Sequence, residues 1–194
     1  NRERLQPARQ LRHGRGVAAA GRVEIADREH FILSREGKLS GPVVVGPLQS
    51  RVSKNWVVVV ARPLHRPGGA FDGVVYANIV VGRFAQLLGG VNLGRHGAVA
   101  LRGKDLAVVA RRGAGGDEPA AVNSRSVSPE FARAYASSPA SGAFMSHAML
   151  DGIERTNAYR QAGPYPLLTV VGLATEDFLA PWRMQTLEVS ALAL

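Results

Sequence analysis

Ionisable side chains gather where a short apolar stretch gives way to a helix-like segment. Asp27, Arg28, Glu29 and His30 follow one another directly and precede Phe31. Such groups can cap a helix, transfer protons or form one wall of a ligand pocket. The position of Asp27 favours helix capping, because its carboxylate can accept the unpaired N–H groups of a first helical turn. Phe31 is expected in the core.

The residue pattern does not indicate a catalytic or metal centre. The chain has no cysteine, no Gly-x-Ser-x-Gly motif and no spacing that would face two carboxylates across a substrate. Its histidines are scattered without the i,i+4 spacing of a helical metal site. They are His13, His30, His65, His96 and His147. We therefore expect no enzymatic activity, no metal and no cofactor in these residues.

The formal net charge of +9 allows a soluble basic nucleic-acid-binding protein as the alternative function. Its cations are nearly all arginines spread along the chain, whereas phosphate-binding surfaces usually form a stripe with aromatic side chains beside it. Only 6% of the residues are aromatic. The pattern favours a solvated globular protein without nucleic acid. Retention on heparin that falls steeply with salt would favour the alternative.

Strand and helix signals occur in the same order twice, about 95 residues apart in the sequence. In the first half, β-branched runs at 42–46, 56–64 and 73–81 predict strands, and 82–88 a short helix. In the second half, 153–161 and 167–174 predict strands that lead into a helix from Thr175. The segment between the two halves predicts a hairpin over 97–112, a loop over 113–121, a helix over 128–138 capped by Ser128 and a strand over 142–150. The expected fold class is α+β, with two tandem units of antiparallel sheet flanked by helices.

This organisation resembles a double Cache domain, the PAS-like extracytoplasmic sensor region of bacterial membrane receptors. The resemblance rests on "IADREHF", "GPLQSRVSKNWVVVVARPL" and "FDGVVYANIVVGRF" in a membrane-distal unit. It rests also on "DGIERTNAYRQAGPYPLLTVVGLATEDFLAPWR" in a membrane-proximal unit. Together they cover about residues 21–185. The resemblance implies a non-catalytic sensor whose full-length protein carries an output domain such as a diguanylate cyclase (GGDEF) or a histidine kinase.

The resemblance also predicts where the units end. The distal unit is expected over 21–89 and the proximal unit over 90–185, with a boundary near Gly89–Gly90. Residues 1–20 match the family's long N-terminal helix poorly, so that helix is expected to be partly or wholly absent. Residues 186–194, "TLEVSALAL", are apolar apart from Glu188 and can begin a second transmembrane helix or form an amphipathic terminal helix. The family reading places the chain in the periplasmic portion of an inner-membrane protein, held by flanking transmembrane helices and compatible with a homodimer.

The predicted ligand site lies in the distal unit. Its lining is expected from two hairpin strands, with Asp27 and His30 closing one side. The residues taken from these strands are Arg51, Lys54, Trp56, Tyr76 and Asn78. Their cations favour a small carboxylate as ligand. The amino-acid-binding subclass has Arg-x-Trp-Tyr where this chain has Lys54, Asn55, Trp56 and Val57, so no amino-acid ligand is inferred. The proximal unit is expected to lack a comparable polar pocket.

Overall fold

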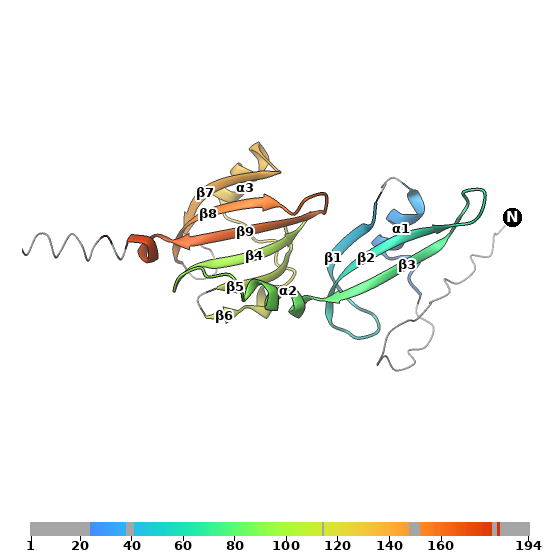
Figure 1. The fold of residues 1–194 in the computed structure, drawn as a ribbon, viewed down its shortest axis with the longest axis horizontal. Helices are drawn as coiled ribbons and strands as arrows, with labels where there is room; N and C mark the ends of the chain where they lie inside the picture. Colours follow the sequence, from blue (N-terminus) through green and yellow to red (C-terminus); the bar gives the residue numbers. More distant parts are fainter. Residues whose placement is uncertain (1–23, 38–40, 114, 148–151, 180–181, 183–194) are drawn as a thin grey trace, which may run out of the picture. The chain divides into compact units, whose positions relative to one another are not determined.

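The chain forms two compact units, Asn1–Val81 and Gly82–Leu194, each with its own antiparallel sheet (Figure 1). The computed structural model describes residues 24–37, 41–113, 115–147, 152–179 and 182. The segments 1–20 and 186–194, for which a missing helix and a membrane helix were expected, lie outside the described residues. The predicted boundary near Gly89–Gly90 between the two Cache units stays a prediction.

The first unit is a three-stranded antiparallel sheet with one helix packed on it. Its strands are β1 (Val43–Gln49), β2 (Trp56–His65) and β3 (Phe71–Val80), in the order β1-β2-β3. Helix α1 (Glu29–Glu36) contacts all three strands. Its Leu33 packs against a buried cluster of β-branched residues and alanine from β1 and β2. The predicted strands, and the predicted place of Phe31 in the core, are confirmed.

The second unit is a six-stranded antiparallel sheet in the order β6-β5-β4-β9-β8-β7. Its strands are β4 (Ala98–Gly103), β5 (Val108–Gly113), β6 (Gly116–Asp117), β7 (Ser141–His147), β8 (Glu154–Gln161) and β9 (Leu167–Ala174). Its helices are α2 (Val81–Leu88), the short 3-10 helix η1 (Pro119–Ala121) and α3 (Pro129–Ser137). The predicted α+β class and its antiparallel sheets are confirmed. The predicted loop at 113–121 is shorter than expected, because it contains β6 and η1.

Helix α3 is capped at its start and hydrogen-bonded to the sheet at its end. At its start, the hydroxyl of Ser128 accepts a hydrogen bond from the backbone N–H of Phe131 at 3.2 Å, which is the predicted cap. At its end, the hydroxyl of Tyr159 on β8 lies 2.7 Å from the carbonyl oxygen of Ala134 and 2.8 Å from that of Ser138. Phe131 and Tyr159 are both buried in one aromatic cluster with Leu168.

Candidate functional site

Asp27 does not cap α1, so the helix-capping prediction is wrong. The N-cap position is Arg28, which makes no side-chain cap bond. The Asp27 carboxylate instead receives two hydrogen bonds from the Arg51 guanidinium, of 2.9 and 2.5 Å, while Arg51 also donates to the carbonyl oxygen of Glu24. A bidentate guanidinium–carboxylate pair outcompetes a neutral N–H donor. The hydrogen bond from Arg51 lowers the pKa of Asp27 below its ordinary value.

The five residues of the predicted lining do not share one face of the first sheet. Tyr76 and Asn78 of β3 stand opposite Ala61 and Val59 of β2, so all four point to the face covered by α1. Trp56 precedes Val57 on β2 and therefore points to the opposite face. The structure brings Tyr76 and Asn78 together and separates Trp56 from them.

The two predicted cations lie in the turn between β1 and β2, where both are exposed. Arg51 is held by Asp27, as described. Lys54 has a positive φ of 60°, and its backbone carbonyl accepts a hydrogen bond from the Gln49 side chain at 3.0 Å. Both cations remain reachable by solvent, but Arg51 already has a carboxylate partner.

His30 contributes an unexpected feature to the same sheet face. Its side chain is buried, and neither ring nitrogen has a hydrogen-bond partner; the hydroxyl of Ser34, one turn later, is also buried without a partner. The His30 ring centroid lies 5.1 Å from that of Tyr76. Burial lowers the pKa of His30 below its ordinary value, so the ring is kept neutral with one donor and one acceptor nitrogen.

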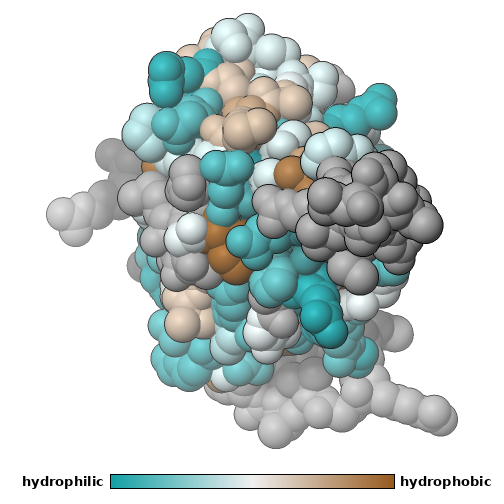
Figure 2. All heavy atoms as spheres, turned by 90° about the vertical axis from the view of Figure 1, so that its left-hand side faces the viewer, coloured by the Kyte–Doolittle hydropathy of each residue, from teal (hydrophilic) through white to brown (hydrophobic). Residues whose placement is uncertain are grey.

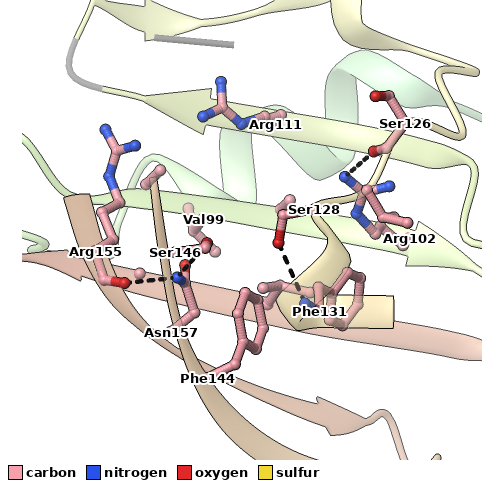
Figure 3. A pocket seen from close by; sticks show the side chains of 15 residues that line it. Val99, Arg102, Arg111, Ser126, Ser128, Phe131, Phe144, Ser146, Arg155 and Asn157 are labelled. Atoms are coloured by element: carbon pink, nitrogen blue, oxygen red, sulfur yellow. Dashed lines mark hydrogen bonds between the residues drawn. The ribbon is translucent and has the colours of Figure 1, made fainter. Parts of the chain in front are cut away.

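A polar cavity of about 100 Å³ lies in the second unit, so the prediction that this unit lacks a polar pocket is wrong. Figure 3 shows the side chains that line it, which come from β4, β5, β7, β8, β9 and the start of α3. The polar ones are Arg102, Arg111, Ser126, Ser128, Ser146, Arg155 and Asn157. The prediction compared only β8 and β9, whereas four further elements supply polar groups.

Arg102 is the most unusual group in this cavity. Its guanidinium donates to two neutral carbonyl oxygens, those of Leu106 at 2.6 Å and Ser126 at 3.1 Å. Its Cζ atom also lies 5.8 Å from the ring centroid of Phe131, in a cation–π arrangement. Burial, with the nearby charge of Arg111, lowers the pKa of Arg102 to about 10. The cation is therefore partly desolvated.

A hydrogen-bonded chain connects the cavity to the helix that begins at Thr175. Arg155 lines the cavity, is almost fully buried, and donates through Nε to the carbonyl oxygen of His96 at 2.8 Å. The Asp177 carboxylate then accepts from the His96 backbone N–H at 2.7 Å and lies 2.8 Å from the imidazole Nδ1. The predicted start of a helix at Thr175 is confirmed.

We expect Asp177→Asn to loosen this helix and to remove an acid-dependent part of the stability. The backbone hydrogen bond from His96 lowers the pKa of Asp177 below its ordinary 3.8. A lowered carboxyl pKa stabilises the fold fully above about 3.8, and that contribution is lost as the pH falls through the folded-state value. The measurement is urea unfolding between neutral pH and pH 3. If the wild type and the variant differed by the same free energy of unfolding at neutral pH and at pH 3, this role of Asp177 would be contradicted.

Two other kinds of feature, a metal centre and a membrane-spanning helix, are absent from the described part of the chain. Within the described ranges, no three residues of the types His, Cys, Asp and Glu gather to hold a metal ion. Among these same residues, no helix combines the length and apolarity required to cross a membrane. On the face shown in Figure 2, strongly apolar residues form only small patches between hydrophilic ones. That distribution is typical of a solvated protein surface.

Comparison with known proteins shows which class of protein the chain resembles. Residues 81–172 match the dCache_1-like family, described as a histidine kinase sensor domain. No curated protein matches the chain. The extracellular domain of the putative histidine kinase rpHK1S-Z16 superimposes with a TM-score of 0.70 at 28% identity, over 86% of this chain and 67% of that one. Over these residues the chain is similar to a Cache-type sensor domain.

Two ligand-bound receptor domains share the fold. The ligand-binding domain of the Pseudomonas aeruginosa amino-acid chemoreceptor PctB, in complex with L-Arg, has a TM-score of 0.59 at 16% identity, over 83% of this chain and 64% of that one. That of Mlp24, with asparagine, has a TM-score of 0.55 at 14% identity, over 82% and 61%. Both show the fold alone, and this chain spans less than two thirds of each. The nucleic-acid alternative finds no support in these comparisons.

Proposed function

We propose that this chain is the periplasmic, ligand-sensing portion of an inner-membrane signalling receptor. The observation that carries the proposal is the match of residues 81–172 to a histidine kinase sensor family, together with the likeness to rpHK1S-Z16 over 86% of the chain. Helices flanking this region would attach it to the membrane, and a homodimer is compatible with that attachment. The similar structures come from kinases and chemoreceptors. A histidine kinase output therefore has more support than a diguanylate cyclase.

Within this proposal the first unit binds a small polar solute on the sheet face of Tyr76 and Asn78. The neutral imidazole of His30 supports this placement, because a buried donor and acceptor without partners cost about 1–3 kcal/mol unless something pairs with them. A ligand can supply those partners. Arg51 and Lys54, exposed in the turn between β1 and β2, favour a carboxylate. A ligand transmits a signal only if it binds two conformations with different affinity.

The proposal is tested by a thermal-shift and calorimetric screen of the chain against small carboxylates, amines, L-arginine and L-asparagine. We expect Asn78→Ala to weaken binding of the best compound about tenfold or more, as loss of one hydrogen bond to a charged group does. If the best compound is a carboxylate, Arg51→Ala and Lys54→Ala should each lower its binding affinity. Trp56 points to the opposite face of the sheet, so Trp56→Ala is the matched control and should leave binding on the Tyr76 and Asn78 face unchanged. Equal affinity in the wild type and Asn78→Ala would refute the placement.

His30→Leu is expected to separate stability from binding. Leucine removes a buried polar ring without partners, so the free energy of unfolding should be unchanged or rise by about 1 kcal/mol, while ligand affinity falls. Because the folded-state pKa of His30 is lowered, wild-type stability should decrease as the pH falls below 6.5 through the folded-state value. The variant should lose that decrease. Urea unfolding at pH 8 and pH 5 measures both effects, and an unaltered pH dependence would show that His30 is solvated.

A further inference from the structure

The cavity of the second unit contains a cation whose charge has no carboxylate partner among the described residues. Arg102 contacts the carbonyl oxygens of Leu106 and Ser126 and the ring of Phe131. Carbonyl oxygens carry partial charge only, so they solvate a guanidinium without neutralising it. None of the described residues that line the cavity is acidic. A site of this kind is electrostatically suited to an anion.

The cavity also offers neutral polar groups at its wall. The Ser128 hydroxyl accepts its bond from the Phe131 N–H, which leaves its own hydrogen to donate. The Ser146 hydroxyl accepts from the Asn157 amide at 3.3 Å and can likewise donate. The N-terminus of α3, of which Ser128 is the cap, adds a positive partial charge at the same wall. Donors therefore surround the space, as a carboxylate requires.

The remaining wall is aromatic. The rings of Phe131 and Phe144 stack with their centroids 5.0 Å apart and an interplanar angle of 22°. Both line the cavity, and Val170 adds an aliphatic side chain to the lining. The volume of about 100 Å³ exceeds the roughly 10–15 Å³ that a single water molecule needs. The space is large enough for a small organic molecule and offers an apolar surface to its body.

We propose that the second unit contains its own binding site for a small carboxylate with an apolar or flat body. The carboxylate contacts Arg102 and the hydroxyl of Ser128, and the body lies against Phe131 and Phe144. The site is distinct from the one proposed on the first sheet. Arg155 lines the same cavity and donates to His96, which binds Asp177, so this part of the cavity wall is connected by hydrogen bonds to the helix that begins at Thr175.

The test uses the whole chain and pairs of probes that differ mainly in charge. ¹⁵N NMR titrations compare benzoate with benzamide, and propionate with propionamide, up to tens of millimolar. We expect the acids, and not the amides, to shift signals of residues 126–131, 144–146 and 155–157 in a saturable way. The position of the shifted signals separates this site from the first unit: acid-specific shifts confined to the first unit overturn this site and leave the one proposed on the first sheet in place. Absence of acid-specific shifts in these residues overturns the proposal.

Two substitutions at Ser128 provide a matched comparison. Asp and Asn both cap helices as well as Ser, so Ser128→Asp and Ser128→Asn should each retain α3, checked by the melting temperature. Ser128→Asp places a negative charge in the cavity that Arg102 also lines and should weaken benzoate binding at least about tenfold. Ser128→Asn should bind within about threefold of the wild type. Arg102→Gln should bind as weakly as Ser128→Asp. Benzoate affinity that is the same in Ser128→Asp and Ser128→Asn would show that the cavity does not recognise charge.

Discussion

Tyr159→Ala is expected to lower the free energy of unfolding by about 3–5 kcal/mol, as removal of a buried aromatic ring does. Tyr159 is 3% exposed and lies between α3 and the sheet, in contact with the rings of Phe131 and Phe144. Its hydroxyl also reaches the carbonyl oxygens of Ala134 and Ser138, at the end of α3. The substitution therefore opens a cavity and frees the helix end. Urea unfolding should show a lower midpoint with an unchanged slope.

Tyr159→Phe separates the two contributions. It keeps the ring and removes only the hydroxyl, so we expect a loss of about 1 kcal/mol, mainly from the Ser138 carbonyl that loses this donor. The Ala134 carbonyl keeps the Ser138 N–H and the Ser137 hydroxyl as donors. If both variants were equally destabilised, the hydroxyl and not the packing of the ring would fix α3. If Tyr159→Ala were nearly neutral, α3 would not depend on this side chain.

The strands and the capped helix could be predicted because local chemistry determines them. A run such as "WVVVVARPL" has the β-branched composition of a buried strand whichever strand it pairs with. These residues do form a strand, β2. Ser128 followed by Pro129 marks a helix start through groups only three residues apart, and the hydrogen bond to Phe131 confirms it. The family resemblance rested on the same short segments. Patterns among residues that are close together in the sequence can be recognised without knowledge of tertiary contacts.

The distal site was less accessible to prediction, because its geometry depends on contacts far apart in the sequence. Asp27 looks like a cap until Arg51, 24 residues away, is placed beside it. Trp56 and Tyr76 both read as inward residues, and only the register of β2 with β3 shows that they lie on opposite faces. His30 was included for its chemistry, but its burial without partners is a property of packing.

The cavity of the second unit was missed although part of its signal is in the sequence. Arg155, Asn157 and Tyr159 alternate on β8, which places them on one face of the sheet. A buried arginine on an inward face is a sign of a site, but its meaning depends on the neighbours. Arg102 and Ser128 are supplied by β4 and the start of α3, and no spacing in the sequence relates them to β8.

Substitution of Gly172 is the second change expected to have a large effect on stability. A side chain at this position would enter the space that Asn157 and Arg155 occupy. Gly172 stands directly opposite Asn157 on β8, and both line the cavity. A Cβ atom at this position would lie 2.4 Å from the Asn157 Oδ1 and 2.9 Å from the Arg155 Cδ. Arg155 is 1% exposed and has little room to move. We expect Gly172→Ala to cost about 1–3 kcal/mol of unfolding free energy, as overpacking of a core does.

The matched control is Gly82→Ala on α2, where a Cβ atom would meet nothing within 4 Å. That variant should be neutral or more stable by up to about 1 kcal/mol, because alanine favours a helix over glycine. Urea unfolding of both variants measures the difference. Gly172→Ala should also displace Asn157 and weaken carboxylate binding in the second unit, while leaving binding in the first unit unchanged. If Gly172→Ala were as stable as Gly82→Ala, Asn157 and Arg155 would have to move aside without a measurable cost. The cavity wall would then be more deformable than the burial of these two side chains indicates.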